Sequence, residues 1–161
     1  MSDWKPILDA IIGSRHGGQT DTLVPRLRDL DTRHPRVAEI QYQLAWTLDT
    51  LDRPADALPH YEQALALGLS DPGEHIGAII GLANCQRLTG APARAVSTLE
   101  TARLQFPDNP ELLPWLALAL HDAARPADAL RELLELLLDT TEAPELMAQQ
   151  RALRHHAARL K

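Results

Sequence analysis

Cysteine, aromatic residues and long apolar segments are all scarce in this sequence. There is one cysteine in 161 residues, which excludes an intrachain disulfide and a cysteine-rich zinc site. The aromatic residues are three tryptophans, two tyrosines and one phenylalanine. Because β-strands favour aromatic and β-branched side chains, so few aromatics argue against an all-β fold.

No apolar segment is long enough to cross a bilayer. The longest, Leu112 to Leu120, contains Pro114 and is far shorter than the roughly 20 residues that a spanning helix needs. Residues Met1 to Leu8 also lack the apolar stretch of a signal peptide. We therefore expect a cytoplasmic protein with no membrane partner.

Basic residues are outnumbered, with 16 Lys and Arg against 22 Asp and Glu and a net charge of −6. Nucleic-acid binding usually needs a basic surface, so no nucleic-acid partner is expected. Four basic residues nevertheless lie near the C-terminus: Arg151, Arg154, Arg159 and Lys161. They indicate either a contact patch or a solvated last helical turn, where the helix dipole favours cations.

Leucine and alanine, with 29 and 24 residues, are what the sequence has in excess, and both favour helices. They occur in a repeated pattern. The segment Arg53–Leu58 recurs as Arg125–Leu130, and Ala91–Val96 is a looser copy between them. Each copy has proline at its second position, which is tolerated at the first position of a helix because the missing N–H would be unpaired there. Each copy therefore predicts a turn followed by a new helix.

Alanines lie twelve residues apart across these turns. The pairs are Ala45 with Ala57, Ala83 with Ala95, and Ala117 with Ala129. In an antiparallel helix pair this spacing places both residues where the two axes approach most closely, at the short end of the usual ~8–10 Å range. The pattern predicts an all-α fold built from helix hairpins.

The spacing resembles the tetratricopeptide repeat, a 34-residue helix hairpin. The best copy supplies the residues of the family pattern in order: Ile79, Leu82, Ala83, Gly90, Ala95, Leu99, Ala102 and Pro107. Stretches such as Leu44-Ala45-Trp46, Gly68-Leu69 and Phe106-Pro107 also resemble a group of small, stand-alone bacterial proteins of this family, group five. The resemblance implies a single domain over 1–161, an all-α, right-handed α-solenoid of about four hairpins with a C-terminal capping helix. The repeats are expected at 3–35, 38–72, 76–109 and 110–142, and the cap at 143–160.

The resemblance also implies a function: a non-catalytic protein-interaction scaffold that binds a peptide or helix in its concave groove. Carried over position by position, the groove residues are Tyr42, Trp46, Asp49, Asn84, Arg87, Leu118, His121 and His155. Chaperone-binding members of the family pair an asparagine like Asn84 with basic residues on adjacent repeats. Here those positions are not basic, so a chaperone-tail adaptor is not expected.

Two alternatives stay open. The protein could be a structural homo-oligomer that assembles through the groove or the cap. It could also be an accessory protein that binds a metal or small ligand through His121 and His155, although that pair lacks obvious further ligands. No resident metal or cofactor is expected.

No catalytic constellation stands out in the sequence. Cys85 falls in the middle of an expected helix beside Asn84, with no histidine assignable as its base. A small buried thiol is the simpler interpretation. The sequence does not identify the partner or the pathway.

Overall fold

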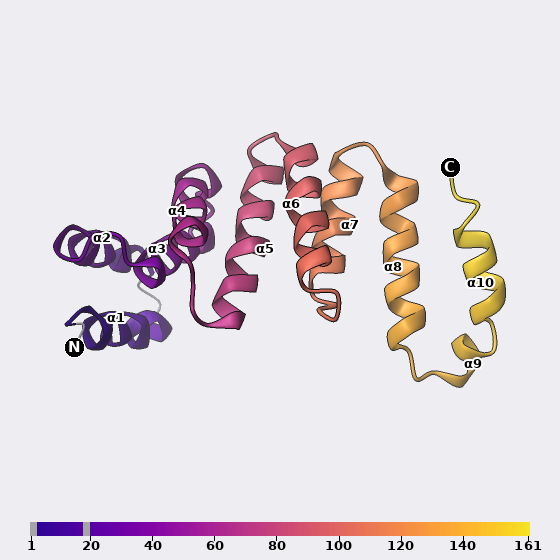
Figure 1. Ribbon diagram of the computed structural model, residues 1–161, viewed down its shortest axis with the longest axis horizontal. Helices are drawn as coiled ribbons and strands as arrows, with labels where there is room; N and C mark the ends of the chain where they lie inside the picture. The colour runs from indigo at the N-terminus through magenta and orange to yellow at the C-terminus, as the bar shows by residue number, and fades with distance from the viewer. Residues whose placement is uncertain (1–2, 18–19) are drawn as a thin grey trace. The chain divides into compact units, whose positions relative to one another are not determined.

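The computed structural model describes residues 3–17 and 20–161, and in these residues regular structure is helical throughout. The all-α fold of helix hairpins expected from the sequence is confirmed. The chain divides into two compact units, which we call unit 1, Met1–Thr89, and unit 2, Gly90–Lys161. The elements of each unit are labelled in Figure 1.

The described part of unit 1, residues 3–17 and 20–89, contains five α-helices and two short 3₁₀ turns. Its elements are α1 (Trp4–Gly13), the 3₁₀ turns Ser14–Gly17 and Thr20–Thr22, α2 (Leu23–Arg33), α3 (Ala38–Thr50), α4 (Pro54–Leu67) and α5 (Pro72–Leu88). α1 packs on α2, α3 packs on α2 and α4, and α5 packs on both α3 and α4.

Unit 2 contains the remaining five helices. They are α6 (Pro92–Gln105), α7 (Leu112–Asp122), α8 (Pro126–Thr140), α9 (Pro144–Met147) and α10 (Gln150–Ala157). α7 packs on α6 and α8, and α10 packs on α8. The expected capping segment consists of two short helices, α9 and α10. The Gln150 side chain donates a hydrogen bond of 2.8 Å to the Leu138 carbonyl and ties the start of α10 to the end of α8.

The repeated sequence motif produces the same local geometry each time. Pro54 and Pro126 begin helices. In the residue before each proline, the guanidinium donates to the aspartate three positions later: Arg53 Nε to Asp56 and Arg125 Nε to Asp128, both at 2.8 Å. These aspartates lie in the first helical turn, where the helix dipole favours negative charge.

The turns inside the hairpins share one unusual backbone conformation. Asp52, Gly90 and Ala124 occupy equivalent places and have φ of 56°, 86° and 59°. The next residue's N–H then reaches back five residues, from Arg53 to Leu48 at 3.0 Å and from Arg125 to Leu120 at 2.8 Å. This bonding satisfies carbonyls at the helix end, and it requires the left-handed conformation that glycine adopts most readily.

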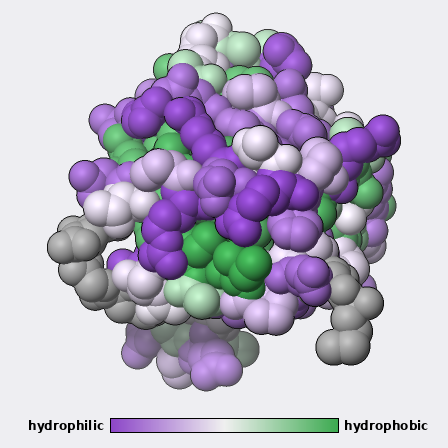
Figure 2. Space-filling model, turned by 90° about the vertical axis from the view of Figure 1, so that its left-hand side faces the viewer, coloured by the Kyte–Doolittle hydropathy of each residue, from purple (hydrophilic) through white to green (hydrophobic). Residues whose placement is uncertain are grey.

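The core consists mainly of aliphatic side chains. Leu27, Leu30, Ile40, Leu44 and Leu48 are fully buried in unit 1. The alanine pairs are buried too, with Ala45 and Ala57 at 0% exposure and Ala117 and Ala129 at 3% and 6%. Figure 2 views the molecule from the side of α1 and α2, where hydrophobic residues gather in the middle and hydrophilic ones surround them.

Candidate functional site

Five of the eight expected groove residues lie in unit 1, on two helices that pack together. Tyr42, Trp46 and Asp49 lie on α3, and Asn84 and Arg87 lie on α5. Trp46 is 42% exposed, which is unusual for the largest apolar side chain. The other four are partly buried.

Trp46 is held in place by Arg15, from the 3₁₀ turn that follows α1. The guanidinium carbon of Arg15 lies 3.8 Å from the centroid of the Trp46 ring, a cation–π contact. The same guanidinium donates hydrogen bonds of 3.1 Å to the Gln43 side-chain oxygen and to the Thr47 hydroxyl. Burial lowers the pKa of Arg15 from its ordinary value, and the guanidinium stays charged because that value is so high.

Gln43 extends this arrangement to a third segment. Its amide nitrogen donates to Glu74 of α5 at 3.2 Å, while its oxygen accepts from Arg15. Burial raises the pKa of the Glu74 carboxyl. The hydrogen bonds Arg15–Gln43–Glu74 therefore join the segment after α1 to α3 and α5, and they fix Trp46 relative to all three.

Beside Gln43, a cavity of about 260 Å³ lies between α1, α3 and the start of α5. Leu8 and Ile12 line it on one side, and Glu39, Asp71 and Glu74 line it on the other. The Asp71 side chain also accepts a 2.9 Å hydrogen bond from the Glu74 N–H and so caps α5.

Two tyrosines pack against glycines of α5. A β-carbon at Gly81 would lie 2.2 Å from the Tyr61 ring, and one at Gly77 would lie 2.6 Å from the Tyr42 hydroxyl oxygen. The two tyrosine rings are 6.3 Å apart and tilted by 54°. Gly77 and Gly81 are one helical turn apart, so together they make room for both rings and let α5 come close to α3 and α4.

Asp49 is partly buried and contacts Tyr61. Its carboxylate accepts a hydrogen bond of 3.4 Å from the Tyr61 hydroxyl. Burial raises the pKa of Asp49, and the Tyr61 hydroxyl partly offsets this. Burial, with the nearby Asp49, also raises the pKa of the Cys85 thiol to about 12. Cys85 is fully buried and stays a neutral thiol at pH 7, as expected for a core residue.

Arg87 and Asn84 contact each other one turn apart on α5. The Arg87 guanidinium donates a 2.9 Å hydrogen bond to the Asn84 side-chain oxygen. This contact orients both side chains on the helix that also supplies Gly77 and Gly81.

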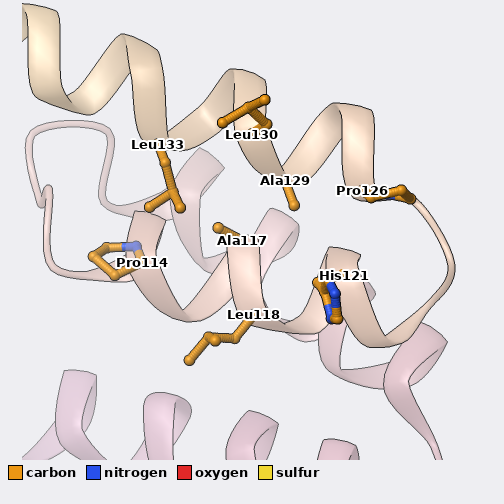
Figure 3. A pocket seen from close by; sticks show the side chains of 8 residues that line it. All are labelled: Pro114, Ala117, Leu118, His121, Pro126, Ala129, Leu130 and Leu133. Carbon is orange, nitrogen blue, oxygen red and sulfur yellow. The ribbon is translucent and has the colours of Figure 1, made fainter. Parts of the chain in front are cut away.

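The other three expected residues lie in unit 2. Leu118 and His121 line a cavity of about 450 Å³ between α7 and α8 (Figure 3). The His121 Nδ1 lies 3.2 Å from the Asp122 carboxylate. His155 is exposed on α10, where its ring contacts His156 at 5.6 Å. Within residues 3–17 and 20–161, no group of three or more histidine, cysteine or acidic side chains could hold a metal ion.

Sequence reasoning missed two features. Arg15 falls in the groove register of the first repeat, but nothing in the sequence showed that it would cover Trp46. The sequence also did not show that Leu130, Leu133 and Leu137 of α8 would be 43% to 47% exposed. No local pattern in the sequence could have found them, because their exposure depends on which side of α8 its neighbours cover.

The family model described as Tetratrico peptide repeat (TPR_5) matches residues 38–160. The chain belongs to the tetratricopeptide repeat family. Proteins of this family bind protein partners and are typically non-catalytic scaffolds, and the fold of this chain is that of such a scaffold. The group-five resemblance seen in the sequence is thereby confirmed.

Solved structures show the same solenoid fold. The crystal structure of MamA protein is similar with a TM-score of 0.71 and 15% identity, over 93% of this chain and 76% of that one. MamA 41-end from Desulfovibrio magneticus RS-1 has a TM-score of 0.70 and 16% identity, over 98% and 91%. The MamA RS-1 ArsTM double mutant has a TM-score of 0.70 and 14% identity, over 99% of this chain and 97% of that one. At these identities the likeness shows the fold alone. No curated protein sequence matches the chain.

No helix in the described part of the tetratricopeptide chain is long and apolar enough to span a bilayer.

Proposed function

We propose that this tetratricopeptide protein binds a peptide or helix of a protein partner on the face that α3 and α5 present in unit 1. The observation that carries the proposal is Trp46: an exposed tryptophan held by a cation–π contact and by hydrogen bonds around it. Tryptophan and arginine are the residues that most often dominate binding energy at protein interfaces.

The support for Trp46 comes from its rigidity. Arg15 lies over the ring and is itself fixed to Gln43 and Thr47, so the pair loses little side-chain freedom when a partner binds. A binding surface ordered in advance leaves more of the contact energy for affinity.

Asn84 and Arg87 would supply the polar contacts on the neighbouring helix. Their side chains are already oriented by the hydrogen bond between them. Arginine and asparagine side chains suit the carbonyls, N–H groups and carboxylates of an extended peptide. Tyr42 and Asp49 contribute less directly, because Tyr42 packs against Gly77 of α5 and Asp49 accepts a hydrogen bond from Tyr61 of α4.

The experiment is affinity capture from a lysate with mass spectrometry, comparing the wild type with Trp46→Ala and Arg87→Ala. Leu104→Ala is the matched control, because Leu104 is 84% exposed on α6 in unit 2. The proposal predicts that the same partner is lost with both unit 1 variants and kept with the control, at unchanged helical circular dichroism. Equal capture by all four proteins would place the binding site elsewhere.

A further inference from the structure

The face of α7 and α8 in unit 2 exposes a concentration of leucine side chains. Leu118, Leu130, Leu133 and Leu137 are 46%, 47%, 43% and 43% exposed. The first three line the cavity of about 450 Å³ and are among the eight lining side chains that Figure 3 labels. Contiguous exposed apolar surface of this kind marks interaction sites more often than isolated leucines do.

The internal repeat shows what kind of structure covers such a face. Position by position, Pro114, His121 and Leu133 correspond to Tyr42, Asp49 and Tyr61, each 72 residues earlier. In unit 1 all three of those side chains lie against α5, through Gly77, Gly81 and Cys85. The natural occupant of this face is therefore an α-helix laid along the hairpin.

In unit 2 the C-terminal helix, α10, packs on α8 but leaves these leucines exposed. Its hydrogen bonds and ion pairs go to another side of α8: Arg131 donates to the Ala157 and Leu160 carbonyls, and Arg154 pairs with Glu135 and Asp139. Arg131, Glu135 and Asp139 follow one stripe of α8 at a spacing of four residues. Leu130, Leu133 and Leu137 follow a neighbouring stripe, which stays exposed.

The helix best suited to the face is α8 of a second copy. Among the described helices, α8 is the one with large exposed apolar residues at i, i+3 and i+7, the spacing of one helix face. Leu130 and Leu133 belong both to this stripe and to the cavity wall, so α8 of a second copy laid on this face would place the same leucines against the cavity of each copy. A twofold axis beside Leu133 would cover the stripe and the cavity of both copies in one step, the commonest symmetry of homo-oligomers.

We propose that two copies of this chain associate through their α7–α8 faces, with α8 packed antiparallel to α8 of the second copy. The contact spans about three turns of helix, which is a smaller area than a standard interface buries. We therefore expect a weak dimer with a Kd in the micromolar range. This association uses unit 2 alone and is independent of partner binding at Trp46.

Sedimentation velocity over about 1–500 μM tests the proposal. The wild type should shift from monomer to dimer across the series. Leu133→Glu should weaken association by about 30-fold or more, since each dimer carries the change twice at its centre. Leu104→Glu is the matched control and should dimerise like the wild type, because Leu104 is exposed elsewhere in unit 2. Trp46→Ala should also dimerise normally, which separates this proposal from the proposed function.

A cross-linking experiment fixes the geometry. Leu133→Cys should form a disulfide-linked dimer under mild oxidation, whereas Leu104→Cys should not, and the native Cys85 is buried and does not compete. If the wild type is a monomer at every concentration, the proposal is wrong, and the α7–α8 face would then be expected to bind a helix of another protein. Association that Leu133→Glu leaves unchanged would overturn it too.

Discussion

The guanidinium of Arg15 lies 3.8 Å over the ring of Trp46, although the two residues come from different helix hairpins. The contact joins the segment after α1 to α3 and orders the most exposed aromatic side chain of unit 1. It links the stability of this unit to its proposed binding surface.

Arg15→Ala should therefore destabilise the protein by about 1–2 kcal/mol, through loss of the cation–π contact and of hydrogen bonds to Gln43 and Thr47. Denaturant unfolding measures the free-energy change. Arg33→Ala is the control, because Arg33 only pairs with Asp29 on the surface and its removal should cost less than about 1 kcal/mol. Equal effects of the two changes would show that Arg15 adds no more than a surface ion pair.

Gly81→Ala should cost about 2–3 kcal/mol, although alanine normally stabilises a helix relative to glycine. The reason is the Tyr61 ring, 2.2 Å from where the new β-carbon would lie. Thermal unfolding of Gly81→Ala in the wild type and in a Tyr61→Ala background measures this coupling. The cost should largely disappear in the second background, and a cost that persists there would contradict the packing described.

These close contacts mark the limit of what the sequence could predict. The repeated Arg-Pro-Ala-Asp and the alanines twelve residues apart predicted the hairpins, because both are local patterns that recur. The seating of Tyr61 on Gly81 joins two helices of different hairpins, and a glycine within a helix has several explanations. Only the structure shows which ring it accommodates.

The candidate site was predictable in part for the same reason. The family register predicted Trp46, Tyr42 and Asp49 alike as groove residues. In the structure Trp46 is 42% exposed, whereas Tyr42 packs against Gly77 of α5 and Asp49 accepts a hydrogen bond from Tyr61 of α4. The exposed leucines of α8 could not be predicted, because their exposure depends on which stripe of α8 the C-terminal helix covers.

Ala124→Gly should stabilise the protein by about 1 kcal/mol and raise its Tm by about 2–4 °C. Ala124 has φ of 59°, where its β-carbon is strained, while Gly90 takes the equivalent place at 86°. The neighbouring Ala123 has φ of −79°, so Ala123→Gly should lower the Tm by a similar amount. Calorimetric melting of both variants checks the opposite signs, and a Tm lowered by both would contradict the interpretation.

Asp49→Asn should stabilise the protein at pH 7 and change little at pH 3. Burial raises the folded-state pKa of Asp49, so the folded protein binds this proton more tightly than the unfolded chain. That contribution to stability is complete below the unfolded value of about 3.9 and is lost as pH rises through the folded pKa. Asparagine keeps an acceptor for Tyr61 and carries no charge.

The measurement is the Tm of both proteins between pH 3 and 8, with Asp108→Asn as an exposed control. The advantage of Asp49→Asn should grow with pH, by about 2–4 °C in all. A constant difference across the range would mean that Asp49 has the same pKa in the folded and unfolded protein.

Trp46 is proposed to anchor a protein partner. Isothermal titration calorimetry of the captured partner, with the wild type and with Trp46→Ala, measures its contribution to affinity. The substitution should raise Kd by about 30-fold or more, as at an interface hot spot, while Leu104→Ala leaves Kd unchanged. A Kd for Trp46→Ala within twofold of the wild-type value would contradict this proposal.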